Sequence, residues 1–158
     1  MGFLEPHVGY RRGDGETHLT PVSRSVTVIS PAQAAAALSA AAATGHPVTL
    51  LSAADAAASV GPAWFAAMID DAAATYPDVR ITALLDCGDA PGHALAALRL
   101  GFRSICFHGA ALDRVRDIAR QYGAHVMTAR PDTLDLAGLE ASGVDIESAC
   151  RDWLDAEG

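Results

Sequence analysis

The sequence contains no lysine and no asparagine, so all 11 of its basic residues are arginine. Without lysine the chain cannot form its own Schiff base or anchor pyridoxal phosphate, and it cannot complete a GxxxxGK[ST] phosphate-binding loop. It has only three cysteines, and no two of them form a CxxC pair. That usage suits a reducing compartment better than a disulfide scaffold, so we expect a cytoplasmic protein.

Clustered positive charge is also missing. The formal net charge is -8, and apart from Arg11 and Arg12 the arginines are scattered singly. A nucleic-acid or anionic-membrane partner is therefore not expected. The longest nearly uncharged stretch, residues 26–54, is interrupted by proline and glycine and is rich in alanine and serine, so no membrane span is predicted.

The chain divides into a short leader and one domain. Residues 1–24 mix glycine, proline and charge without helical or strand periodicity, and we interpret them as a flexible N-terminal arm or leader. Residues 25–158 are long enough for one stable domain with its own core. Because 34 of the 158 residues are alanine, that core is expected to be closely packed from small side chains.

Short β-branched runs alternate with alanine-rich helical stretches along this domain. The predicted strands are 25–29, 47–51, 80–85, 104–107 and 124–128. The predicted helices are 31–43, 62–75, 89–101, 112–122, 134–141 and 145–156. Strands that start 20 to 33 residues apart and are apolar throughout fit right-handed crossovers in a parallel sheet. The fold class is α/β, with about five parallel strands and alternating helices.

Three segments carry a resemblance to a known family. Residues 46–53 read HPVTLLSA, residues 83–88 read ALLDCG, and residues 93–109 read HALAALRLGFRSICFHG. In this order they resemble the class II, zinc-dependent fructose-bisphosphate aldolases, and the resemblance covers about residues 32 to 128. It implies a (β/α) barrel scaffold, a bound zinc ion and a small sugar phosphate or aldehyde as substrate.

The resemblance also implies roles for individual residues. Asp86 stands at the position of the family's catalytic aspartate. Cys87 stands where the family has a zinc-binding histidine, and His108 stands where it has the aspartate of a D-G-S motif. With His93 at the start of the intervening helix, these residues form a candidate zinc site, since a thiolate is a competent zinc ligand. The alternative is a buried cysteine beside two exposed histidines.

Ligands of parallel sheets bind beyond the carboxyl ends of the strands. The other polar residues expected at that rim are Ser30, Ser52, Asp55, Asp89, Thr128 and Arg130. Arg130 could hold the phosphate or carboxylate of a small anionic ligand through two parallel hydrogen bonds. Its alternative role is a salt bridge to Asp132 or Asp135.

Length limits how far the resemblance can extend. A complete (β/α)8 barrel needs about 200 to 250 residues, whereas this chain has 158. Five strands leave two unpaired edges, so we expect either a half-barrel that pairs with a second copy or a flavodoxin-like open sheet. A homodimer or higher homo-oligomer is therefore predicted. Its candidate seams are the patch formed by Trp64, Phe65 and Met68 and the terminal helix carrying Trp153 and Leu154.

Two functions remain open from the sequence. The first is a catalytically degenerate aldolase-like domain that binds a ligand or a protein partner. The second is a metal-dependent lyase or isomerase acting on a small sugar phosphate or aldehyde. In the second, Asp86 is the acid/base, Cys87 and His108 hold zinc, and Arg130 anchors an anionic group. The length and the replaced histidine favour the first.

Overall fold

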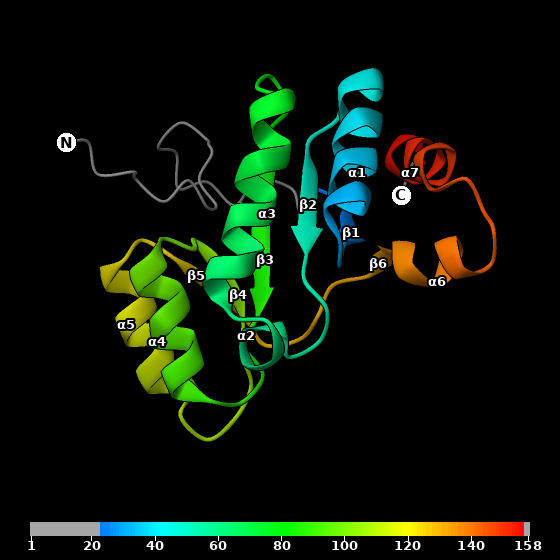
Figure 1. Cartoon of the computed structure of the whole chain (residues 1–158). Helices are drawn as coiled ribbons and strands as arrows, with labels where there is room; N and C mark the ends of the chain where they lie inside the picture. Colours follow the sequence, from blue (N-terminus) through cyan, green and yellow to red (C-terminus); the bar gives the residue numbers. More distant parts are fainter. Residues whose placement is uncertain (1–22, 157–158) are drawn as a thin grey trace.

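The computed structural model describes residues 23–156, which form an α/β domain around one six-stranded parallel sheet (Figure 1). The strands are β1 (Ser25–Thr27), β2 (Val48–Leu51), β3 (Ile81–Asp86), β4 (Ser104–Cys106), β5 (His125–Met127) and β6 (Thr133–Asp135). Their order across the sheet is β5-β4-β3-β2-β1-β6, and every neighbouring pair is parallel. The predicted α/β class with alternating strands and helices is confirmed.

Helices connect the successive strands from β1 to β5, and two more follow β6. They are α1 (Pro31–Thr44), α2 (Ala56–Ser59), α3 (Pro62–Thr75), α4 (Pro91–Leu100), α5 (Leu112–Gln121), α6 (Leu136–Ala141) and α7 (Ile146–Asp155). The start of α1 shows how the sequence sets a boundary. Ser30 accepts a hydrogen bond from the Gln33 backbone N–H at 3.2 Å, and the Gln33 side chain accepts one from the Ile29 backbone N–H at 2.9 Å. This reciprocal cap fixes where β1 gives way to α1.

The helices form one row on one face of the sheet. From β1 to β5 each strand lies beside its predecessor in the same direction, so right-handed crossovers place all the connecting helices on the same side. In keeping with this, α7 packs on α1, α1 on α3, α3 on α4, and α4 on α5. The sheet is thus wound in a single direction like part of a (β/α) barrel, and not in two directions like a flavodoxin.

The sheet must also curve. If it were flat, the edge strands β5 and β6 would lie about 24 Å apart, which is five strand spacings. The connection between them has only five residues, 128–132, and the six steps from Met127 to Thr133 can reach about 21 Å at most. The two edges therefore approach each other, as in an incompletely closed barrel. Of the two sheet shapes open from the sequence, the curved half-barrel is the one found.

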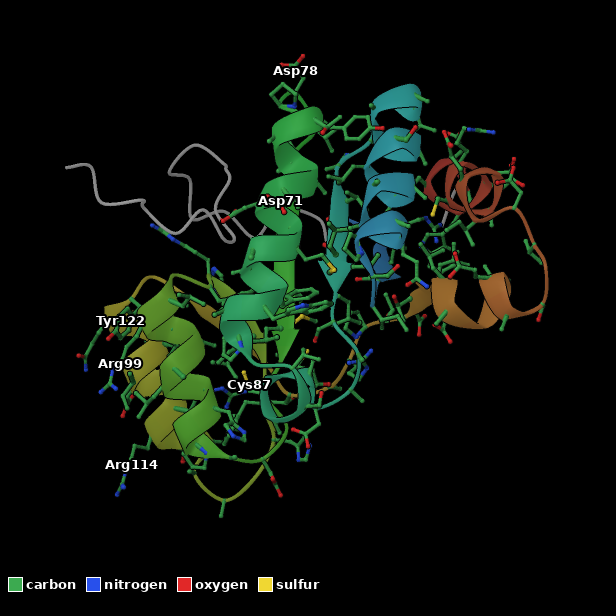
Figure 2. The ribbon with its side chains drawn as sticks, viewed as in Figure 1. Asp71, Asp78, Cys87, Arg99, Arg114 and Tyr122 are labelled. Carbon is green, nitrogen blue, oxygen red and sulfur yellow. The ribbon has the colours of Figure 1, made fainter. Side chains whose placement is uncertain are left out.

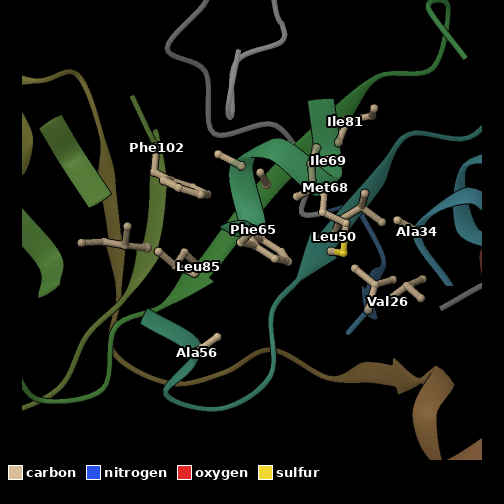
Figure 3. Packing of buried hydrophobic residues seen from close by; sticks show 14 of the residues in the cluster. Val26, Ala34, Leu50, Ala56, Phe65, Met68, Ile69, Ile81, Leu85 and Phe102 are labelled. Carbon is tan, nitrogen blue, oxygen red and sulfur yellow. The ribbon is translucent and has the colours of Figure 1, made fainter. Parts of the chain in front are cut away.

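The main core lies between the sheet and the helix row (Figure 3). At its centre, the Phe65 ring of α3 stacks on Phe102 with ring centroids 6.1 Å apart. Alanines such as Ala34 and Ala37 let α1 approach the sheet closely, as expected from the composition. Of the predicted Trp64–Met68 surface patch, Phe65 and Met68 are buried in this core, and only Trp64 is exposed. The patch is therefore not a seam of three residues.

The end of the chain differs from the prediction. Leu134 was expected to begin a helix, but Thr133–Asp135 is the sixth strand, which pairs with β1, and α6 begins at Leu136. A three-residue strand is too short to show an alternating pattern, and its pairing partner lies more than 100 residues earlier. Between β2 and α3 the structure also has the single turn α2, for which no helix was predicted.

The two ends of the described chain contact each other. Residues 1–22 of the predicted arm lie outside the described residues. Arg24, at the end of that arm, stacks over the Trp153 ring at 4.8 Å and donates hydrogen bonds to the Ala156 carbonyl. Trp153 also donates its ring N–H to the Ser25 carbonyl at 2.9 Å. Trp153 and Leu154, the other expected dimer interface, thus contact or are buried by residues of the same chain. None of the described helices is long and apolar enough to cross a membrane.

Candidate functional site at the carboxyl ends of the strands

Asp86 is the centre of the candidate site. It is the last residue of β3 and is buried, with its side chain 8% exposed. Its backbone N–H donates to the Ser52 hydroxyl at 2.9 Å, and its Oδ1 accepts the Gly88 backbone N–H at 2.9 Å. Because Ser52 directly follows β2, these bonds join the ends of two neighbouring strands. The structure therefore brings Asp86 and Ser52 together at the carboxyl ends of β3 and β2.

Arg130 reaches the same point from the β5–β6 connection. Its Nη1 donates to Asp86 Oδ2 at 2.8 Å, and its Nη2 donates to the Ser52 carbonyl at 3.0 Å. The sequence left Arg130 with Asp132 or Asp135 as ion-pair partners, but its partner is Asp86, 44 residues earlier. The pair forms because the β5–β6 connection brings Arg130 to the carboxyl end of β3, a contact that spacing along the sequence does not indicate. Both carboxylate oxygens of Asp86 thus accept hydrogen bonds from within the chain.

Gly88 permits a close approach beside this pair. Its φ is +60°, and a Cβ at this position would collide with the Asp55 carboxylate. Asp55 is the only described residue other than glycine with a positive φ, at 55°. A left-handed conformation is tolerated by aspartate better than by most residues. The turn after β3 and the loop after β2 are thus fitted to each other, a contact that the sequence did not reveal.

Cys87 points away from this rim. It is fully buried within the helix-side core, and its thiol lies 3.8 Å from the Leu85 carbonyl (Figure 2). Burial, and secondarily the negative charge of Asp86, raise the pKa of the Cys87 thiol to about 12. Cys106 lies on the opposite face of the sheet, where burial and then Asp86 raise its pKa to about 11, against a lowering by Arg130. At neutral pH both cysteines are protonated.

The two histidines of the predicted metal set do not join Cys87 in a metal-binding group of the described residues. His108 is exposed after β4, and its backbone N–H donates to the Gly88 carbonyl at 3.0 Å. His93 is half-buried in the first turn of α4, and its buried Nδ1 atom has no hydrogen-bond partner among residues 23–156. Within residues 23–156, no three His, Cys, Asp or Glu side chains are grouped so that they could hold a metal ion.

The remaining predicted rim residues take separate places. Ser30 is used as the cap of α1. Asp55 is exposed against Gly88, and Asp89 is exposed, with its Cβ beside Gly109. Thr128 is exposed in the β5–β6 connection. Of these six residues, Ser52 and Arg130 form hydrogen bonds with Asp86. Asp55 lies against Gly88, whose backbone N–H donates to Asp86.

The comparisons agree with this architecture. The family model for Fructose-bisphosphate aldolase class-II matches residues 24–125, well over half of the chain. The chain belongs to this family. The match begins just before β1 and ends at the first residue of β5, so it starts earlier than the resemblance recognised from the motifs. No curated protein matches the chain.

The zinc ion that the family implies can be tested against the side chains of this rim. A zinc site needs about four donors, and a cysteine must be deprotonated to serve as one. Here the Cys87 thiol is turned into the core with a pKa of about 12, and the carboxylate of Asp86 is paired with a guanidinium. The described residues do not fit a zinc ion, and the Cys87, His108 and His93 set is not assembled as a metal centre.

Proposed function

We propose that this chain is a catalytically degenerate domain of the class II aldolase family, which uses the rim around Asp86 to bind a ligand or a protein partner. One observation carries the proposal: both oxygens of the Asp86 carboxylate accept hydrogen bonds from the chain itself. A general acid or base must reach a proton on its substrate. A carboxylate held by the Arg130 guanidinium and the Gly88 N–H is positioned for structure rather than for proton transfer.

The other function, a metal-dependent lyase or isomerase, depends on residues that have structural roles here. Its metal ligand Cys87 is a buried, protonated thiol, and its anion anchor Arg130 already neutralises Asp86. Zinc-dependent aldol chemistry would require both side chains to leave these positions. The binding function requires neither to move.

The charges of the rim favour some ligands over others. Asp55, Asp86 and Asp89 contribute three carboxylates, against the one guanidinium of Arg130 that is already paired. A phosphate or carboxylate ligand would meet this negative charge at short range. The small anionic ligand expected from Arg130 alone is therefore less favoured than a neutral polar or cationic one.

Metal analysis of the purified protein tests the proposal. We expect well below one zinc per chain after expression with added zinc, and no zinc-supported aldol cleavage of fructose 1,6-bisphosphate. The variants Cys87→Ala and Cys106→Ala form a matched pair, because both thiols are buried but only Cys87 was expected to bind metal. Stoichiometric zinc that is lost in Cys87→Ala and kept in Cys106→Ala would establish the metal-dependent function instead.

We also propose that the protein forms a homodimer, now on a different basis. The residues expected at the seam are largely buried within the chain, but β5 and β6 are paired on one side only within the described residues. An unpaired strand edge offers N–H and C=O groups to a second chain. Light scattering should give twice the 16.3 kDa monomer mass. A Val126→Pro substitution on β5 should shift the protein to monomer, and a monodisperse wild-type monomer would refute the dimer.

A further inference from the structure

The connection between β5 and β6 lies across the carboxyl ends of the strands. Its residues, 128–132, leave β5 at one edge of the sheet and enter β6 at the other, and in Figure 1 they run past the ends of β3 and β2. Arg130 is the middle residue of this segment. Because no helix is inserted here, unlike in the four preceding crossovers, the segment itself touches the rim.

The Arg130 guanidinium is held by two oxygen atoms from neighbouring strands. One is Asp86 Oδ2 at 2.8 Å and the other is the Ser52 carbonyl at 3.0 Å. A carboxylate and a backbone carbonyl are oxygen donors of the kind that bind cations in proteins. The Arg130 side chain is 30% exposed, so the pair lies at the surface end of an otherwise buried carboxylate.

The Asp86 carboxylate needs this positive charge. Burying a carboxylate without a counter-charge is costly, and the alternative is loss of the charge or of the fold. The other carboxylates near this end of β3, Asp55 and Asp89, have the same sign as Asp86. The ion pair that the structure shows for Asp86 is with Arg130.

We infer that Arg130 is a built-in cation of this family domain: its guanidinium occupies a cation subsite formed by the Asp86 carboxylate and the Ser52 carbonyl. When the side chain is removed, this subsite accepts a small planar cation of the guanidinium or amidinium class. The inference rests on the proposed function in one respect, that the rim is not a zinc centre. It goes further by assigning the subsite and the chemical class of cation that fills it.

The planarity of the cation follows from the geometry. Nη1 and Nη2 of one guanidinium satisfy two acceptors on different strands at the same time. An ammonium group is a compact point charge and lacks this fixed fork of donors. The subsite should therefore discriminate between guanidinium and methylammonium, although both carry one positive charge.

Chemical rescue of Arg130→Ala tests the inference. We expect the melting temperature of this variant to fall by about 5–10 °C, because it leaves a buried carboxylate unpaired. Guanidinium chloride at low millimolar concentration, far below denaturing levels, should restore about half of the loss. Methylammonium chloride and sodium chloride at equal concentration should restore little. The double variant Arg130→Ala/Asp86→Asn should show no rescue, because its subsite lacks the carboxylate.

Two further variants keep the test decisive. Arg120→Ala removes an exposed arginine that pairs with Asp117, and it should neither lower the melting temperature appreciably nor respond to guanidinium. Arg130→Lys retains the charge and serves if the alanine variant does not fold. Its melting temperature should lie clearly below that of the wild type because lysine cannot reach both acceptors with one planar group.

The outcomes separate this inference from the proposed function. Equal rescue by methylammonium, rescue that persists in the double variant, or a lysine variant as stable as the wild type would overturn the built-in cation. Stoichiometric zinc in the wild-type protein would instead overturn the proposed function, and with it the premise of the inference. Failed rescue in a zinc-free protein leaves the binding function intact and refutes only the assignment of the subsite.

Discussion

The two faces of the sheet are made from alternate residues of the same strands, yet they bury different chemistry. The face toward the helices is apolar, and its strand residues include Val26, Val48, Leu50, Ala83, Leu85 and Ile105. The other face combines a small apolar cluster with buried polar groups. These residues include Ser25, Thr27, Thr49, Leu51, Leu84, Asp86 and Cys106. Within the described chain, no helical residue belongs to that second apolar cluster.

The difference shows where polar chemistry can be kept in such a domain. The helix-covered face is stabilised by packing, and Cys87 on that side is protonated and inert. The opposite face is stabilised by individual polar pairs, such as Ser23 with Thr49 at 2.6 Å and Thr27 with Thr133 at 2.9 Å. The Asp86–Arg130 pair continues this polar face at the rim. Polar groups that could contact a ligand thus come from this face.

The largest expected effect compares two adjacent leucines. Leu85 lies in the large helix-side core and Leu84 in the small cluster with Leu51, Cys106 and Met127, and each is at most 1% exposed. We expect Leu85→Ala to cost about 4–5 kcal/mol of unfolding free energy and Leu84→Ala about 2–3, since cavity cost rises where neighbours cannot relax. Urea unfolding followed by circular dichroism measures both. Equal losses would show that the two faces are packed equally rigidly.

A smaller effect distinguishes the two faces at high pH. Folding raises the pKa of Cys87 to about 12 and that of Cys106 to about 11, from an ordinary value of 9.0. At a pH between the ordinary pKa and the raised pKa of a thiol, the unfolded chain has released the thiol proton and the folded chain retains it. The free energy of unfolding therefore falls as pH rises above about 9. Each thiol should remove about 1 kcal/mol of unfolding free energy by about pH 10.

Substitution separates the two contributions. Both variants should lose less unfolding free energy at alkaline pH than the wild type. For Cys87→Ala this advantage over the wild type should keep growing up to about pH 12, whereas for Cys106→Ala it should stop growing near about pH 11. The Arg130 guanidinium lowers the pKa of Cys106 and accounts for part of this difference. Unfolding free energies from urea titrations across this pH range provide the measurement. A Cys87→Ala protein with the wild-type alkaline slope would contradict the assignment of a buried, protonated thiol.

Much of the fold could be predicted because local pattern and tertiary structure agree. The β-branched runs at β1 to β5 and the alanine-rich stretches between them are local signals, and they gave the order of these strands and of the helices α1, α3, α4 and α5 correctly. β6 could not be found in this way, because three residues show no period and its position depends on pairing with β1. The position of Leu134 beside Val26 is a property of the whole sheet.

The candidate site was predictable in location but not in pairing. The rule that ligands bind at the carboxyl ends of parallel strands identified Asp86, Ser52 and Arg130. Which charge neutralises Asp86 depends on the path of residues 128–132, and the sequence carries no local signal for that path. Likewise, the direction of Cys87 follows from its place one residue beyond Asp86, where alternation turns its side chain toward the helices. The family motif instead favoured reading it as a ligand.

The smallest expected effect concerns two hydroxyl residues of β1 on the polar face. Thr27 shares a 2.9 Å hydrogen bond with Thr133, whereas the buried Ser25 hydroxyl has no hydrogen-bond partner among the described residues. Thr27→Val keeps the shape but leaves Thr133 without its partner, so we expect a loss of about 1 kcal/mol of unfolding free energy. Ser25→Ala removes an unpaired buried hydroxyl and should be neutral or stabilising by up to about 1 kcal/mol. Both values come from urea unfolding, with the Ser25 carbonyl bond to Trp153 retained in each variant. A Ser25→Ala protein that loses as much as Thr27→Val would mean that this hydroxyl is paired in solution, and that the polar face is satisfied along its whole length.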